Sequence, residues 1–226
     1  RAFQDFARRQ PEGLKYVYSV EGFYRAAFLR NRYGGDIREY NRLHGTAYAA
    51  YDRIRLPPTF PAQGHALEQQ DWEEFVRHSL GLVWIRVAPG ARLAYQRFLK
   101  AKYQRIEALH RDYAAAYPSF EDVPLPATAP AGGLALSDWA AFISGWTDPV
   151  RGTLHIAPAA ALRVESIEER FRAYARDRFG NLAAANRQWQ TGFADFADVP
   201  LPQRDAHYLY FLEQRGALRL EFVTRN

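Results

Sequence analysis

A short signature recurs three times along this chain of 226 residues and ends each time in Leu-Pro. In each copy two aromatic residues stand three positions apart, an aliphatic residue follows three positions later, and Leu-Pro comes soon after it. The aromatic and Leu-Pro residues are Tyr48, Tyr51, Leu56 and Pro57 in the first copy, Tyr117, Phe120, Leu125 and Pro126 in the second, and Phe193, Phe196, Leu201 and Pro202 in the third. Such a repeat indicates stacked copies of one supersecondary unit, because a single copy cannot bury its apolar face alone.

An amphipathic helix is predicted before each signature. Apolar residues recur three to five positions apart over residues 28–40, 98–109 and 171–182, while arginine and lysine occupy intervening positions. In the first copy Gly34-Gly35 adds a residue, which predicts a kink or break in that helix. The Leu-Pro end of each signature predicts an extended segment or a tight turn, because proline cannot extend a helix.

A polar residue stands four positions after Ile37, Ile106 and Leu182 in the three copies. These residues are Asn41, His110 and Asn186. Polar side chains close to a helix end commonly bond to nearby backbone groups, so we expect each of the three to do so. For His110 a structural contact is favoured over catalysis, because it replaces the asparagine of the other two copies.

A second helix is predicted after the loop that follows each Leu-Pro. The helix opens on Asp71-Trp72, on Asp138-Trp139 and, more weakly, on Tyr208. Ser137 or Asp138 is expected to cap it by accepting backbone N–H bonds, and Asp71 is expected to play the equivalent role. Paired carboxylates can also serve glycoside hydrolysis, but these two recur with the fold, so no catalytic residue is assigned and no enzyme is expected.

The sequence therefore predicts a mainly α fold, with three tandem helix–loop–helix repeats packed into one helical domain. The domain covers residues 1–226, and its units span roughly 20–90, 91–160 and 161–226. Residues 152–156 are the one stretch predicted to be briefly extended. The repeated aromatic residues, with Trp72 and Trp139, are expected to pack within the scaffold because they are evenly repeated rather than clustered.

Composition excludes several kinds of chemistry. The chain has no cysteine, which removes disulfides, thiolate metal sites and cysteine nucleophiles. The formal charge of +5 arises from 30 basic and 25 acidic residues, so mixed surface ion pairs are expected and a nucleic-acid partner is not. The histidines lack the spacing of a helical metal site and no phosphate-binding glycine loop occurs, so no metal and no cofactor are predicted.

The start of the chain and its apolar runs bear on where the chain belongs. It contains no methionine and opens within a helical pattern, which predicts a segment of a longer protein. No run approaches the roughly 20 apolar residues that a membrane-spanning helix needs.

The second copy resembles a known segment of carbohydrate-related bacterial proteins. The residues that carry the resemblance run from Phe98-Leu99 through Tyr103 and Ile106 to Leu109, and then from Tyr117 to Pro126. This pattern is similar to a segment that follows part of the catalytic barrel in β-galactosidase-type glycoside hydrolases. Tandem copies look more like the large extracytoplasmic insertion of certain sugar ABC-transporter permeases, and residues 218–226 resemble the stretch that leads such permeases back toward the membrane.

The permease resemblance implies a non-catalytic, extracytoplasmic (periplasmic) portion of an inner-membrane protein. The implied partners are the periplasmic solute-binding protein and the permease's own membrane spans, and the implied role is docking or shaping of substrate entry. Loops carry contacts more often than repeats do, so we expect contact residues at Phe60, Gln63, His65 and Arg151.

Two other functions are consistent with the composition. The aromatic surplus of 14 Tyr, 15 Phe and 5 Trp suits a carbohydrate-binding accessory module of a glycoside hydrolase, since aromatic faces stack on sugar rings. The arginine-dominated positive charge would suit a helical nucleic-acid binder. Neither the galactosidase catalytic motifs nor a concentrated basic run is present in the sequence, which favours the permease insertion.

Overall fold

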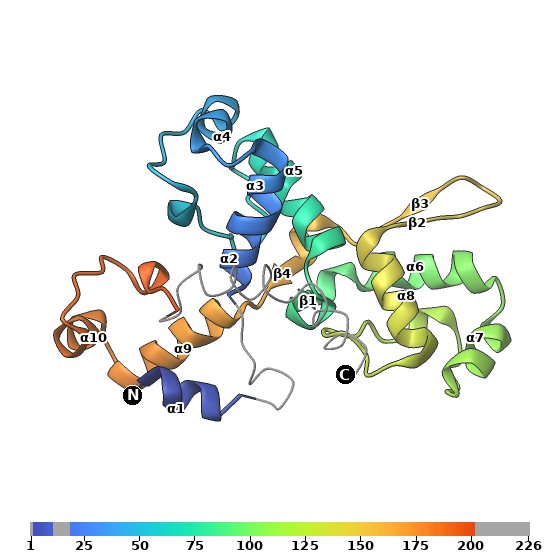
Figure 1. The fold of residues 1–226 in the computed structure, drawn as a ribbon. Coiled ribbons are helices and arrows are strands. Elements are labelled where there is room, and N and C mark those ends of the chain that lie inside the picture. Colours follow the sequence, from blue (N-terminus) through green and yellow to red (C-terminus); the bar gives the residue numbers. More distant parts are fainter. Residues whose placement is uncertain (1, 11–18, 202–226) are drawn as a thin grey trace, which may run out of the picture. The chain divides into compact units, whose positions relative to one another are not determined.

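The computed structural model describes residues 2–10 and 19–201, and it is mainly α-helical as predicted (Figure 1). The chain divides into two compact units. Unit 1 combines residues 1–56 with 166–226, and unit 2 comprises residues 57–165. The prediction of a single domain over 1–226 stays a prediction.

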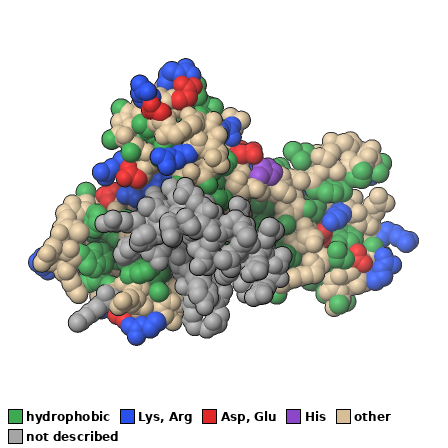
Figure 2. Space-filling view, in the orientation of Figure 1, with side chains coloured by type: hydrophobic (Ala, Val, Ile, Leu, Met, Phe, Trp, Pro, Cys, Tyr) green, Lys and Arg blue, Asp and Glu red, His purple; other side chains and the backbone are tan. Residues whose placement is uncertain are grey.

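Unit 1 is built from short helices. They are α1 (Ala2–Arg8), α2 (Val20–Phe23), α3 (Arg30–Tyr33), α4 (Ile37–His44), α9 (Ile167–Phe179) and α10 (Leu182–Trp189). A π-helical segment, Tyr24–Leu29, joins α2 to α3. The rings of Phe6 on α1 and Phe171 on α9 pack edge-on with their centroids 5.3 Å apart, and both are buried. Basic and acidic side chains lie side by side around α4 (Figure 2), in ion pairs such as Arg42–Glu39.

Unit 2 contains helices and short strands. They are α5 (Ala66–Glu74), β1 (Ile85–Val87), α6 (Arg92–Tyr103), α7 (Ile106–Tyr113), α8 (Gly133–Ser144), β2 (Trp146–Thr147), β3 (Leu154–His155) and β4 (Leu162–Val164). Its core includes aromatic rings from α6 and α8. The Phe142 ring centroid lies 5.2 Å from that of Tyr95 and 5.8 Å from that of Phe98, and all three side chains are buried.

Two antiparallel strand pairs complete unit 2. β2 pairs with β3, which confirms the extended stretch predicted within 152–156. β1 pairs with β4 in the register Ile85↔Val164, and single bridges at Thr59 and Thr128 flank this ribbon on its two sides. The segments after the first two Leu-Pro signatures thus pair with β4 and β1. β1 and β4 were not predicted, because strands this short carry too little periodicity to identify.

Each helix before a signature ends and starts again. α3 ends before Gly34, which has φ 85°, as the Gly34-Gly35 insertion predicts. The prediction of an uninterrupted helix in the other copies is wrong, because α6 ends before Gln104 (φ 61°) and α9 ends before Gly180 (φ 69°). A residue with positive φ after a helix stops the ladder of backbone bonds. At Gln104 no glycine signals this break.

The predicted backbone contacts of the helix-end asparagines are confirmed. The Asn41 Nδ2 donates to the carbonyl oxygen of Tyr48 at 2.9 Å, and the Tyr48 N–H donates to Asn41 Oδ1 at 3.0 Å. Asn186 makes the same two bonds with Phe193, at 2.9 and 3.1 Å. An amide side chain therefore holds the first aromatic residue of the signature against the preceding helix.

The second copy departs from this arrangement at His110. His110 Nε2 lies 2.8 Å from the carbonyl oxygen and 3.0 Å from the backbone nitrogen of Tyr117. One ring nitrogen is either a donor or an acceptor, so histidine makes only one of the two bonds that asparagine makes. In every copy the residue directly after the helix is left-handed. It is Gly45 in the first copy, Ala114 (φ 50°) in the second and Gln190 (φ 57°) in the third.

The second half of each signature has one local conformation. A 3₁₀ turn is followed by an extended residue, and the turns are Tyr51–Arg53, Phe120–Asp122 and Phe196–Asp198. The extended residue's carbonyl oxygen accepts a bond from the preceding helical segment: Ile54 from Arg25 (3.2 Å), Val123 from Gln96 (3.0 Å) and Val199 from Arg172 (3.0 Å). The extended conformation before Leu-Pro is confirmed, while Pro202 and the segment at Tyr208 lie outside the described residues.

Two buried tryptophans connect the second helices to the Leu-Pro segments. The indole Nε1 of Trp72 donates to the carbonyl oxygen of Pro57 at 2.8 Å, and that of Trp139 donates to Pro126 at 3.0 Å. Both rings are fully buried. Their expected packing role is confirmed.

Candidate functional site

The Asp138 carboxylate lies inside α8, so the predicted cap role of Ser137 or Asp138 is wrong. Asp138 is fully buried, and its Oδ2 accepts hydrogen bonds from the hydroxyls of Tyr103 (2.7 Å) and Tyr113 (2.8 Å). Its Oδ1 pairs with Lys102. Asp71 is likewise buried within α5 rather than at its start. Both aspartates follow the residues that begin their helices by more than a turn.

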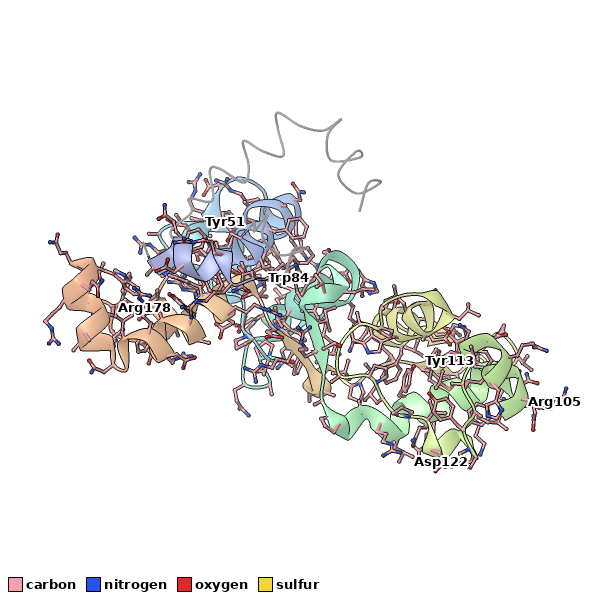
Figure 3. The ribbon with its side chains drawn as sticks, turned by 90° about the horizontal axis from the view of Figure 1, so that it is seen from below. Tyr51, Trp84, Arg105, Tyr113, Asp122 and Arg178 are labelled. Atoms are coloured by element: carbon pink, nitrogen blue, oxygen red, sulfur yellow. The ribbon has the colours of Figure 1, made fainter. Side chains whose placement is uncertain are left out.

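The tyrosines around Asp138 stay protonated. Burial raises the pKa of Tyr95 to about 12. Burial also raises the pKa of Tyr103 and of Tyr113 above the usual range, and the Asp138 carboxylate adds to the rise. Figure 3 shows Tyr113 among the side chains that fill the space between α6, α7 and α8. With three donors on one enclosed carboxylate, the cluster ties these helices together and serves packing.

A second buried polar cluster joins α2 to α9 in unit 1. The Ser19 hydroxyl donates to Glu168 Oε1 at 2.6 Å, and the Arg172 guanidinium donates to Glu21 Oε1 at 2.9 Å. Burial, and next the neighbouring Glu21 carboxylate, raise the pKa of Glu168 to about 7. Folded unit 1 therefore keeps a proton on Glu168 at pH values where a solvated glutamate has lost it.

Three of the predicted contact residues lie on the loop before α5. Phe60 packs edge-on against Trp72, with ring centroids 5.8 Å apart, so it supports the core. His65 caps α5 by accepting the Leu67 N–H at 3.3 Å, and thus takes the role expected of Asp71. Gln63 is exposed. The side-chain contacts of Phe60 and His65 are those of a structural loop.

The fourth predicted contact residue, Arg151, lies at the tip of the β2–β3 hairpin. The buried Asp148 carboxylate accepts the backbone N–H groups of Val150 (2.8 Å) and Arg151 (3.2 Å), which together with the Arg151 guanidinium lower the pKa of Asp148. The Gly152 N–H donates to the Asp148 carbonyl at 2.8 Å, and the Asp148 N–H donates to the Thr153 carbonyl at 2.9 Å. These bonds fix the tip, while Val150 remains 79% exposed.

The base of the hairpin is fixed by packing. Gly145 has φ 99°, and a Cβ there would lie 3.2 Å from Ile156 Cδ1 and 3.3 Å from Leu154 Cδ1, so only glycine fits without strain. The ring of Trp146 packs edge-on against Phe98 of α6, with centroids 5.7 Å apart. The hairpin is therefore attached to α6 at its base and runs alongside α6 toward its tip (Figure 1).

A groove of about 630 Å³ lies between α6 and this hairpin. Its lining residues are Arg97, Lys100, Ala101 and Gln104 on α6, and Asp148, Val150, Arg151, Thr153 and His155 on the hairpin. Three of these side chains are cationic, and the one carboxylate in the lining, Asp148, is bonded to the hairpin tip. Figure 2 shows basic side chains over α6 and α7 and hydrophobic ones on the hairpin. The hairpin and the groove together form the candidate site.

Sequence reasoning identified Arg151 but missed the α6 side of the groove. Arg97, Lys100 and Gln104 recur at helical spacing, which is the signal that could have placed them on one face. Which face of α6 meets the hairpin depends on the contact between Trp146 and Phe98, and a one-dimensional pattern does not contain that contact.

The described ranges contain no group of three His, Asp or Glu side chains placed to hold a metal ion. Within those same ranges, every helix is too short or too polar to cross a bilayer. No family model matches the chain, and no curated protein and no solved structure matches it.

Proposed function

We propose that this chain is a non-catalytic docking domain in the extracytoplasmic part of a sugar ABC-transporter permease, where it binds the transporter's periplasmic solute-binding protein. The observation that carries this proposal is the β2–β3 hairpin. Its backbone is fixed by Asp148, while Val150 (79%) and Leu154 (58%) are exposed to solvent.

A fixed and exposed hairpin suits protein docking for an energetic reason. Ordering a loop on association opposes binding, so a loop that is already ordered binds more tightly with the same contacts. Exposed apolar side chains gain from burial against a partner, and arginine is enriched at such interfaces. At the tip, Val150 supplies an exposed apolar side chain and the adjacent Arg151 supplies an arginine.

The sequence resemblance supplies the setting. It implies membrane spans of the permease outside this chain, and a solute-binding protein that delivers the sugar to them. A domain on the extracytoplasmic side would meet that protein first. The hairpin of unit 2 is then the contact element, and the helices of unit 2 are its support.

We also propose that the chain consists of three tandem helix–loop–helix repeats packed into one helical domain. The support is local: each copy has a left-handed residue after its helix, namely Gly45, Ala114 or Gln190, and a 3₁₀ turn opened by its second aromatic residue. The copies provide the scaffold, and the hairpin is an addition in one unit.

The proposal is tested by binding of the whole chain to the solute-binding protein encoded with the parent transporter, measured by biolayer interferometry with and without the sugar. We expect a micromolar dissociation constant. Absence of association at high-micromolar concentration would contradict the docking role. An unrelated solute-binding protein of similar size and charge serves as the control and is expected not to bind.

The carbohydrate-binding module remains the rival function. It requires exposed aromatic faces, whereas Tyr51, Phe120, Trp72 and Trp139 are buried. Calorimetric titrations with a panel of oligosaccharides are therefore expected to be flat. Saturable heat with any of them would favour the module.

A further inference from the structure

We infer that the groove between α6 and the hairpin accepts carboxylates from an acidic surface of the docking partner, with Arg97, Lys100 and Arg151 as the residues that bind them. This inference rests on the proposed docking function and adds the chemistry of the partner's surface.

The cations stand on both sides of the groove. Arg97 and Lys100 are one helical turn apart on α6, and both are exposed. Arg151 faces them from the hairpin, and its side chain is 68% exposed. A carboxylate that enters the groove therefore meets positive charge from two elements whose backbones are already fixed.

Lys100 and Arg151 each have an acidic neighbour within the chain, but both cations can still bind a partner's carboxylate. Lys100 pairs with Glu121 at 3.3 Å, but both side chains are more than 60% exposed, and such surface pairs contribute little and exchange readily. Arg151 contacts Asp148 through one guanidinium nitrogen at 3.3 Å. A guanidinium has five N–H donors, so most of its donors remain for a ligand.

The lining favours a protein surface over a free small anion. Val150 and Ala101 line the groove beside the cations, and Val150 is among the most exposed apolar side chains of the described residues. A small anion gains nothing from this apolar surface, whereas a protein buries it together with its carboxylates. A volume of about 630 Å³ is of the size that accommodates several side chains of a partner's loop.

The test is the association rate of the chain with the solute-binding protein at about 20 mM and about 300 mM salt. The groove variant is Arg97→Glu with Lys100→Glu, and the matched control is Arg105→Glu with Arg111→Glu, which makes the same change in net charge at exposed positions of the α7 segment. We expect the groove variant to associate at least about tenfold more slowly at low salt, with the control close to wild type. Equal slowing in both variants would overturn the inference, because net charge alone would then explain it.

A second arm separates this inference from the docking proposal. A fluorescent oligoglutamate peptide is titrated into both variants at low salt, with oligolysine as the control peptide. If the solute-binding protein does not associate at all, the docking role fails, and the inference then stands only if oligoglutamate binding is lost in the groove variant and kept in the control. If the solute-binding protein binds the groove variant as it binds wild type, docking stands and the inference is overturned. Far-UV circular dichroism of each variant confirms that these exposed substitutions leave the fold intact.

Discussion

The indole Nε1 of Trp139 donates a hydrogen bond to the carbonyl oxygen of Pro126 at 3.0 Å, and the Trp139 side chain is fully buried. This bond explains why tryptophan and Leu-Pro occur together in the first two copies. The proline ends the signature, and its carbonyl oxygen becomes the acceptor that holds the next helix in place. The equivalent bond from Trp72 to Pro57 is 2.8 Å long.

Replacement of this tryptophan therefore tests the scaffold. Trp139→Phe removes the donor, leaves the Pro126 carbonyl without it, and creates a small cavity, so the free energy of unfolding is expected to fall by about 2–4 kcal/mol. Urea denaturation measures the change. Trp189→Phe, at a half-buried position of unit 1, is the control and is expected to lose less. Equal losses would show that the hydrogen bond is unimportant.

The left-handed residue after α7 gives a stabilising substitution. Ala114 has φ 50°, a conformation in which a Cβ is strained, so Ala114→Gly is expected to raise the free energy of unfolding by up to about 1 kcal/mol. Ala115→Gly is the matched control, because Ala115 is not among the residues with positive φ and glycine there is expected to destabilise. Thermal or urea unfolding measures the stability of both variants. Destabilisation by Ala114→Gly would contradict a left-handed backbone conformation at Ala114.

Glu168 predicts a pH dependence of stability. Its pKa is raised to about 7 in the folded protein, above the usual 4.5, so the folded state binds the proton more tightly than the unfolded state. The stability that this proton contributes is complete below about pH 4.5 and is lost as the pH rises to about 7. For one proton the slope is at most about 1.4 kcal/mol per pH unit.

Glu168→Gln removes this titration. Its unfolding free energy is expected to change less between about pH 5 and pH 8 than that of wild type, and at pH 8 the variant is expected to be the more stable of the two. The exposed Glu107→Gln serves as control and should retain the wild-type pH profile. Parallel profiles for Glu168→Gln and wild type would show that Glu168 does not carry the effect.

The conformation of the hairpin base is predicted to require glycine at position 145. Gly145→Ala forces φ 99° on a residue with a Cβ and brings that atom within 3.3 Å of two side chains, so a loss of about 1–3 kcal/mol is expected. Gly132→Ala is the control, because a Cβ at Gly132 meets nothing within 4 Å and its φ of 167° is extended. Urea denaturation compares the two, and equal stability would indicate that the hairpin base is not constrained.

Local patterns in the sequence predicted the features that depend on local structure. The extended Leu-Pro segments and the contacts of Asn41 and Asn186 follow from backbone rules that act over a few residues, and these are confirmed. The helix break at Gln104 was missed because no glycine marks it. The predicted cap role of Asp138 is wrong. Aspartate often caps the start of a helix, but Asp138 lies within α8, where two tyrosine hydroxyls and one lysine surround its buried carboxylate.

The candidate site was less accessible to sequence reasoning. Loops carry contacts more often than repeats do, which favours Arg151, and the structure places it on the groove. Phe60 and His65 also lie on a loop, but Phe60 packs against Trp72 and His65 accepts the Leu67 N–H. The difference is set by tertiary contacts of Trp72 and α5, which the loop composition does not encode.

The docking role of the hairpin tip is tested by substitutions at Val150 and at an equivalent exposed position elsewhere in unit 2. The dissociation constant of the solute-binding protein is measured for Val150→Glu and for Leu134→Glu, which place the same charge at two exposed apolar positions of unit 2. We expect at least about tenfold weaker binding for Val150→Glu, because the new carboxylate faces an acidic partner at the contact, and nearly unchanged binding for Leu134→Glu. Unchanged binding by Val150→Glu would show that the hairpin tip is not the docking element.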